Sequence, residues 1–209
     1  MVFNIISVSS ILFPLIAGLY FYYRIGELQT YFLWFIGFSC VFEIASSVLA
    51  YNGIQNHWVF RLFLVCDFLF FAWFFYQRHK YPKWLLIFTY IISGFIVFDY
   101  FNTLLLHVSL YHSNLFFLSV FLYFIVLSYY VLITLLDEYS PTLNPIFWIA
   151  SARLFYYTCI FVIYVSSSFP IFSSNSSHSV DTFAIINGVG NIVCNILFGV
   201  SFLCKRVQV

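Results

Sequence analysis

Long apolar segments recur along almost the whole chain, and each is long enough to cross a lipid bilayer as one helix. A helix rises about 1.5 Å per residue, so roughly 20 apolar residues span the hydrocarbon layer. Seven segments meet this length, at about residues 3–23, 29–50, 58–77, 84–103, 114–136, 145–167 and 182–204. The runs are continuous and lack the alternation typical of outer-membrane β-strands. The pattern therefore predicts an all-α, polytopic transmembrane bundle of seven helices, with residues 1–209 forming a single domain.

Two prolines refine this pattern. Pro14 lies inside the first segment and predicts a kink there, because proline removes a backbone hydrogen bond from a helix interior. Pro145 lies just inside the start of the sixth segment, where its missing N–H costs nothing. Asn144 precedes it and is a suitable N-cap for that helix.

The composition agrees with a protein whose main solvent is lipid. Of the 209 residues, 64% are apolar and only 7% are charged, whereas a soluble domain carries about 25% charged residues. The net charge is +1. These values exclude a soluble enzyme, a nucleic-acid-binding protein and a disordered chain, because too few polar side chains remain to cover a surface that faces water.

The basic residues predict the orientation of the chain in the membrane, because Lys and Arg concentrate in cytoplasmic loops. With seven spans, six of the eight basic residues fall on one side: Arg24, Arg78, Lys80, Lys83, Lys205 and Arg206. The other two, Arg61 and Arg153, lie within predicted spans. We therefore expect an inner-membrane, multi-pass protein with its N-terminus outside and its C-terminus in the cytoplasm.

Charged side chains inside the predicted spans form two candidate ion pairs. Glu43 lies about seven residues before the end of its segment and Arg61 about three after the start of the next, a gap that the long Arg side chain covers across the short 51–57 connection. Asp67 and Arg153 both lie near the middle of their segments, so their depths also match. Arg61 and Asp67 are six residues apart, which rotates them by about 240° around a helix, so two separate pairs are favoured over one cluster.

Two interpretations of these polar residues stay open. In the first, they fix which helices touch. In the second, one charge binds a ligand or moves protons, since ionisable residues inside a membrane are functional candidates by default. Asn187, Asn191 and Asn195 follow an i, i+4, i+8 spacing that places them on one face of the last segment. Such a stripe indicates either a polar interior or hydrogen bonds between helices without a cavity.

No sequence motif of a known enzyme class is present, such as G-x-S-x-G, H-E-x-x-H, C-x-x-C or a phosphate loop. Four of the five histidines lie in predicted outer loops, and their spacing is not that of a metal site. We therefore expect no catalytic residue, no cofactor and no bound metal.

Several short motifs suggest a relationship. Phe13-Pro14-Leu15-Ile16, the acidic residues Glu43 and Asp67, and Asn144-Pro145-Ile146-Phe147-Trp148 together resemble a group of small seven-helix inner-membrane proteins of Bacteroidota. These bundles are similar to the membrane segments that precede sensor kinases. The resemblance implies a sensor-like membrane module. The sequence ends soon after its last predicted span, so we expect its output to come from another protein.

The first interpretation is therefore a non-enzymatic, sensor-like or ligand-binding module that acts through partner proteins. Its partners would be the lipid bilayer and a membrane or signalling protein, with no nucleic acid. The residues expected to line or lock its polar interior are Glu43, Arg61, Asp67, Arg153, Asn187 and Asn191. A small transporter or channel that uses the same charges is the alternative, and a membrane-embedded enzyme acting on a lipid is the third.

The depth match between Glu43 and Arg61 yields a first prediction. Glu43→Gln should destabilise or inactivate the protein, and Arg61→Gln should do much the same, because each leaves its partner's charge alone in the membrane. Thermal melting in detergent measures the effect. If both single variants behave like the wild type, these two residues are not paired.

Overall fold

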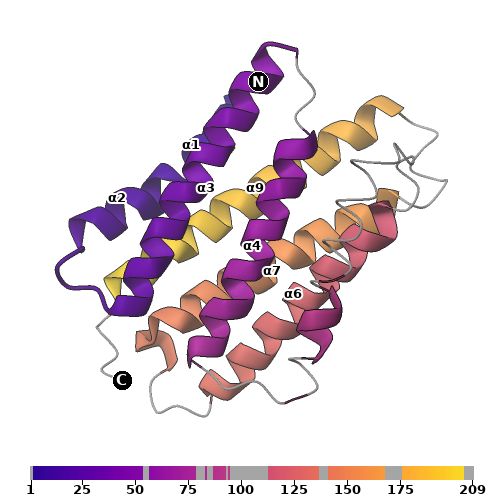
Figure 1. Ribbon diagram of the computed structural model, residues 1–209. Coiled ribbons are helices and arrows are strands. Elements are labelled where there is room, and N and C mark those ends of the chain that lie inside the picture. Colours follow the sequence, from indigo (N-terminus) through magenta and orange to yellow (C-terminus); the bar gives the residue numbers. More distant parts are fainter. Residues whose placement is uncertain are drawn as a thin grey trace. The chain divides into compact units, whose positions relative to one another are not determined.

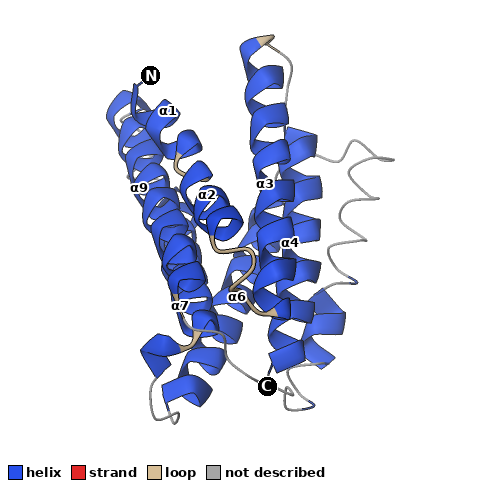
Figure 2. Ribbon diagram, turned by 90° about the vertical axis from the view of Figure 1, so that its left-hand side faces the viewer, coloured by secondary structure: helices blue, strands red, loops and turns tan. Residues whose placement is uncertain are grey.

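The computed structural model describes residues 2–53, 57–78, 83, 87–92, 94, 113–136, 141–167 and 176–204 (Figure 1). These residues form helices and connecting turns, and no strand occurs among them (Figure 2). The helices with defined bounds are α1 (Val2–Ser9), α2 (Leu12–Tyr20), α3 (Glu27–Tyr51), α4 (His57–Arg78), α6 (Ser113–Leu136), the 3₁₀ turn η1 (Pro141–Leu143), α7 (Pro145–Ser167) and α9 (Ser176–Leu203).

The all-helical prediction is confirmed for the described residues. Helices α3, α4, α6, α7 and α9 each coincide with one predicted apolar segment, whereas most of the predicted segment 84–103 lies outside the described residues. Among the described residues, three helical stretches are long and apolar enough to cross a membrane: Glu27–Leu49, Pro145–Ile163 and Ile185–Leu203. The chain is thus compatible with a membrane protein, while the seven-span topology and the sides of the termini stay predictions.

The kink expected at Pro14 is a break between two helices. Pro14 has no N–H to offer the carbonyl of Ser10, four residues earlier, and its ring crowds that carbonyl. The N–H of Phe13 instead donates to the Ser10 carbonyl at 3.1 Å. Helix α1 consequently ends at Ser9, and α2 begins at Leu12.

Helix α7 begins as the sequence predicts. Pro145 is its first residue, and Asn144 is buried immediately before it. The Asn144 Oδ1 atom accepts a hydrogen bond from the backbone N–H of Ile146 at 3.0 Å. This bond satisfies one of the N–H groups that have no partner within the first turn of a helix.

The chain groups into two compact units, Met1–Gly37 with Phe124–Val209, and Phe38–Tyr123. In the first unit, α9 is the central helix, and α1, α2 and α7 pack against it. Figure 2 shows α1 and α2 running alongside α9. The prediction of a single transmembrane domain is not decided by this grouping and stays a prediction.

Small residues let helices of the first unit approach closely. A Cβ atom on Gly18 of α2 would collide with Leu33 of α3 and lie 3.2 Å from Cζ of Phe202 on α9. A Cβ atom on Gly190 of α9 would lie 3.5 Å from Cβ of Cys159 on α7. Between α3 and α9, the rings of Phe32 and Phe198 are also in contact, with centroids 4.9 Å apart.

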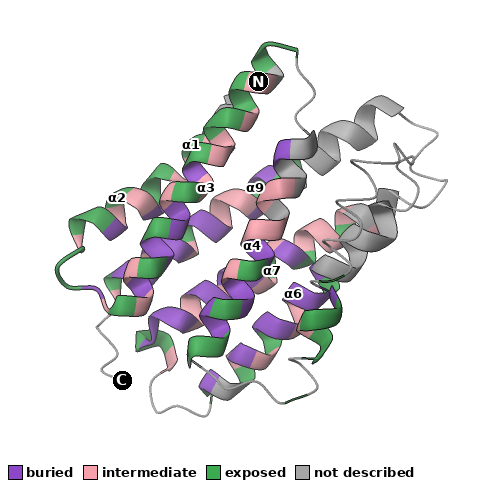
Figure 3. Cartoon of the chain, in the orientation of Figure 1, coloured by how far each residue is buried: buried purple, intermediate pink, exposed green. Residues whose placement is uncertain are grey.

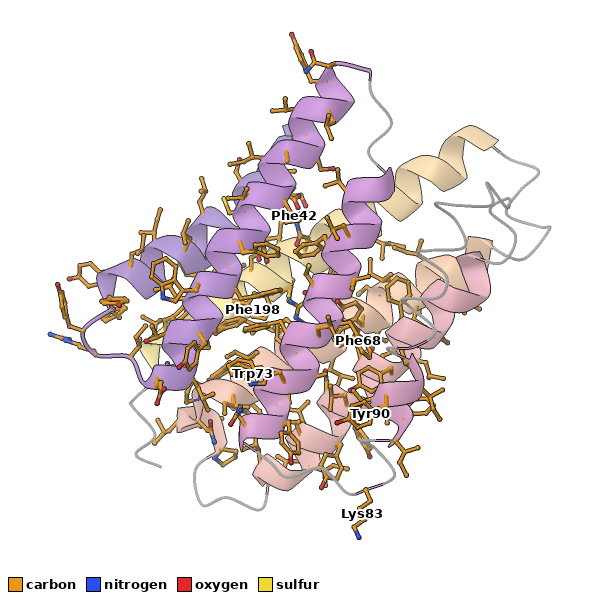
Figure 4. The ribbon with its side chains drawn as sticks, in the orientation of Figure 1. Phe42, Phe68, Trp73, Lys83, Tyr90 and Phe198 are labelled. Atoms are coloured by element: carbon orange, nitrogen blue, oxygen red, sulfur yellow. The ribbon has the colours of Figure 1, made fainter. Side chains whose placement is uncertain are left out.

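In the second unit, Tyr123 is the centre of an aromatic cluster. Its fully buried ring lies 4.7 Å from the ring of Phe68 and 6.0 Å from that of Phe88, between centroids. The Tyr123 hydroxyl and the Thr89 hydroxyl share a hydrogen bond of 2.7 Å. A buried phenol thus keeps a polar partner, as such groups generally do. Figure 4 labels Phe68 on α4 and, further along the chain, Tyr90.

Two helical glycines provide a matched test of the packing in the first unit. Gly18→Ala should lower the free energy of unfolding by about 1–3 kcal/mol, the usual cost of overpacking, because Leu33 and Phe202 are both buried. Gly37→Ala is the control, since its nearest neighbour would be Cδ1 of Leu15 at 4.0 Å. It should be neutral or stabilising by up to about 1 kcal/mol.

Thermal unfolding in detergent, followed by circular dichroism, measures both variants. Equal stability of the two alanine variants would contradict the close approach at Gly18.

Candidate functional site

Arg153 is a buried cation in the first unit, with only 5% of its surface exposed. Its Nη1 atom donates a hydrogen bond of 3.2 Å to the hydroxyl of Tyr157, one turn further along α7. Its Cζ atom lies 5.2 Å from the ring centroid of Phe198 on α9 and 5.6 Å from that of Tyr157. These distances fall within the range of cation–π interactions, which stabilise a guanidinium more strongly when it is desolvated.

Helix α6 contributes the next layer of this site. The ring of Phe124 stacks on that of Tyr157, with centroids 4.2 Å apart and an interplanar angle of 3°. Ser128 lies one turn further along α6 and is fully buried. Its hydroxyl has no hydrogen-bond partner among the described residues. Phe124 and Ser128 share one face of α6, as Arg153 and Tyr157 share one face of α7.

The chain order places Ser128 near the level of Arg153. Only residues 137–144 separate α6 from α7, and consecutive helices with a short connection run antiparallel. Ser128 lies one turn after Phe124 on α6, and Arg153 lies one turn before Tyr157 on α7. In an antiparallel pair these two positions are at about the same level. We name the group formed by Phe124, Ser128, Arg153, Tyr157 and Phe198 the arginine site. It combines a permanent cation, a phenol and a hydroxyl in apolar surroundings.

A second polar group, the serine–asparagine seam, joins α1 to α9. The Asn191 Nδ2 atom donates to both the carbonyl and the hydroxyl oxygen of Ser7, at 3.3 Å each. The Ser7 hydroxyl donates to the carbonyl of Gly188 at 3.5 Å. The Asn195 Nδ2 atom donates to the hydroxyl of Ser10 at 2.7 Å, and that hydroxyl donates to the Ser7 carbonyl at 2.6 Å. The break before Pro14 thus lies against two amides of α9.

Gln29 makes a third polar contact with α9. Its Nε2 atom donates to the carbonyl of Ser201 at 2.8 Å, and its Oε1 atom accepts from the N–H of Gly26 at 2.9 Å. Gln29 is buried, so both ends of its amide are satisfied without water. The contact ties the turn between α2 and α3 to the last turns of α9.

Of the residues predicted from sequence for a polar interior, those whose side chains the structure describes lie in different environments. Arg153 is buried on α7, and Asp67 is fully buried on α4. Glu43 on α3 and Asn191 on α9 are half-buried, whereas Asn187 on α9 is exposed. Figure 4 labels Phe198 of the arginine site.

Neither predicted ion pair is decided by these positions. The side chain of Arg61 lies outside the described residues, so its pairing with Glu43 stays a prediction. Asp67 and Arg153 belong to different compact units, and their pairing stays a prediction as well.

Sequence reasoning did not anticipate three residues that bond α9: Ser7 of α1, Ser10 in the break after α1, and Gln29 of α3. One signal for Ser10 was available: it lies four residues before Pro14, at the carbonyl that proline leaves without a partner. Small hydroxyl side chains also occur where transmembrane helices approach closely. For Gln29 and for Phe198 of the arginine site, no local pattern in the sequence distinguished them from their neighbours.

Comparisons with known proteins leave the family open. No family model, no curated protein and no solved structure matches the chain. The resemblance to seven-helix proteins of Bacteroidota therefore stays a prediction that rests on short motifs. In the described part of the chain, no group of three or more His, Cys, Asp and Glu side chains is placed to hold a metal ion.

The hydrogen bond between Ser10 and Asn195 can be measured by a double-mutant cycle. Ser10→Ala and Asn195→Ala should be non-additive by about 0.6 kcal/mol, and by no more than about 1.7 kcal/mol, the range found for hydrogen bonds between membrane helices. Thr158→Ala is the matched control, because its hydroxyl donates only to Leu154 of its own helix, at 2.6 Å. The cycle of Thr158→Ala with Asn195→Ala should be additive.

Unfolding free energies of the single and double variants, obtained in detergent with a chemical denaturant, give both coupling energies. Additivity in the Ser10 cycle would show that this bond does not contribute.

Proposed function

We propose that the chain is a multi-pass protein of the inner membrane that acts as a sensor-like or ligand-binding module through partner proteins, without catalysis of its own. The membrane part is supported by the three helical stretches long and apolar enough to cross a bilayer. Two of these stretches belong to α7 and α9, the helices that hold Arg153 and Phe198. The binding part is supported by what surrounds Arg153.

The observation that carries the proposal is a permanent cation buried among aromatic rings. Arginine cannot lose its proton at any physiological pH, so its charge must be compensated where it lies. Placing a charge at the centre of a membrane costs about 2.5–3.5 kcal/mol even on the lowest scales. The hydrogen bond to Tyr157 and the ring of Phe198 supply part of that compensation.

A carboxylate is the partner that the guanidinium fits best. The guanidinium presents a planar fork of five N–H donors, which matches the two oxygens of a carboxylate. We propose that Asp67 supplies this group in one state and that an acidic ligand supplies it in another. The exchange would alter how α7 packs on α9, and a partner protein would read the change.

A transporter or channel is the second candidate, and one observation favours it. The first predicted span is discontinuous, with its break bonded to Asn195 of α9. Interrupted helices of this kind form ion and substrate sites in many secondary transporters. Here the oxygens beside the break come from Ser7 and Ser10, so the candidate cargo would be a small monovalent cation.

The binding proposal predicts a preference for acids. Decanoate should raise the thermal midpoint of the purified chain in lipid nanodiscs, whereas decanol, which has the same tail without the charge, should not. A ligand at about 100 times its dissociation constant stabilises the folded state by about 2.7 kcal/mol. Arg153→Gln should remove the difference between the two probes, and Asn187→Gln, at an exposed amide of α9, should preserve it.

Two results would count against the binding module. The first is an equal response of the wild type to decanoate and decanol. The second is a flux of sodium, potassium or protons into vesicles that contain the chain, above that of protein-free vesicles. If Asn195→Leu abolished such a flux, the transporter would be the better function.

A further inference from the structure

The face of α2 that points away from the other helices carries aliphatic side chains that no other part of the described chain covers. Leu12, Ile16 and Leu19 are all exposed, and Ile16 has 64% of its surface accessible. Their i, i+4, i+7 spacing places them on one stripe of the helix. The stripe continues to the end of α2 at Tyr20.

Beyond this stripe, the side chains change from aliphatic to amphipathic and then to charged. Tyr20 is 80% exposed and Tyr23 is 98% exposed, with Tyr22 partly exposed between them. Arg24 follows and is also exposed. We name residues 20–24, which begin at the last residue of α2, the tyrosine turn; all of them except Phe21 are exposed, and Figure 3 shows the exposed colour where α2 ends.

The backbone of the tyrosine turn is ordered by hydrogen bonds. The N–H groups of Arg24 and Ile25 both donate to the carbonyl of Phe21, at 2.7 and 3.1 Å. The Ile25 side chain is buried. Gly26, the next residue, is held by Gln29, which in turn bonds Ser201 of α9. The three phenols therefore project from a defined turn that is tied to the central helix of the first unit.

The order of side chains along this face matches the order of layers in a bilayer. Aliphatic groups suit the hydrocarbon, tyrosine rings suit the boundary where one end is apolar and the other is wet, and arginine suits the headgroups. Tyrosine and tryptophan are enriched at this depth in membrane proteins. In water alone, three exposed rings beside an exposed aliphatic stripe would be an unfavourable surface.

We propose that the tyrosine turn is an interfacial anchor, with the phenols of Tyr20, Tyr22 and Tyr23 in the headgroup boundary and Arg24 on the phosphates of anionic phospholipids. The aliphatic stripe of α2 leads directly into the turn, and this continuity favours a lipid surface over a protein partner. The inference rests on the proposed membrane location of the chain. It adds the depth at which the first unit sits and a lipid contact that sets it.

Nitroxide labels on single cysteines test the depth. The labels are placed at Ile16→Cys, Tyr23→Cys and Thr142→Cys, in a chain whose five native cysteines are replaced, in vesicles of phosphatidylcholine and phosphatidylglycerol. We expect the label at position 16 to be relaxed mainly by oxygen. The label at position 142, on the exposed turn η1, should be relaxed mainly by an aqueous nickel chelate. The label at position 23 should lie between the two.

A second measurement keeps the native cysteines and tests the lipid contact. The thermal midpoint of the wild type should rise when phosphatidylglycerol replaces part of the phosphatidylcholine in nanodiscs. Arg24→Lys should keep this rise and Arg24→Gln should lose part of it, because each basic residue near an anionic surface adds to binding. An unchanged rise in Arg24→Gln would overturn the phosphate contact.

Extraction with alkaline carbonate separates the failure of the anchor from the failure of the membrane proposal. A chain that carbonate releases from membranes is not integral, and both proposals then fail. If the chain stays in the membrane but the label at position 23 is as open to the nickel chelate as that at position 142, the anchor alone is wrong. A label at position 23 that neither reagent reaches would indicate a protein contact there and would equally overturn the anchor.

Discussion

The close approach of neighbouring helices to α9 is the constraint on which the first unit depends. In a bilayer, where the proposed function places these helices, lipid offers no hydrogen bonds and no hydrophobic drive, so helices associate through tight packing and side-chain hydrogen bonds. Gly18 brings α2 within reach of Phe202, and Gly190 brings α9 against Cys159 of α7. Asn191 then bonds Ser7 of α1, and Asn195 bonds Ser10 just after it. At Gly18, a methyl group in place of hydrogen would collide with Leu33 of α3, whereas at Gly190 it would meet Cys159 at an ordinary contact distance of 3.5 Å.

The helices could largely be predicted from the sequence because a membrane span needs only length and apolarity. The start of α7 was equally readable, since Asn144 and Pro145 are local signals. Length and apolarity do not predict whether a segment forms one continuous helix. The segment around Pro14 forms two short helices, α1 and α2. Proline marks the place of such a break. The direction of the chain at the break also depends on the hydrogen bond between Ser10 and Asn195, which lie 185 residues apart in the sequence.

The candidate site was visible in the sequence only in part. Arg153 could be identified because a charge within an apolar run is conspicuous. Phe198 could not, because it is one of 30 phenylalanines and only the packing of α9 on α7 selects it. Ser7 likewise gains its role from a partner on a distant helix. Composition identifies which residues are costly in a membrane, and the fold decides which neighbours compensate them.

The polar groups buried in the first unit differ in what could change their state. Asn195 and Gln29 are neutral, and their hydrogen bonds to Ser10 and Ser201 are made whatever the pH or the ionic surroundings. Of the buried side chains described in this unit, Arg153 alone carries a charge. A permanent charge interacts with an anion more strongly than a neutral amide does, so under the proposed function Arg153 is the group whose surroundings an acidic ligand would change. A protein that responds to a ligand needs two conformations that differ in their affinity for it, and the proposed function places that difference at Arg153.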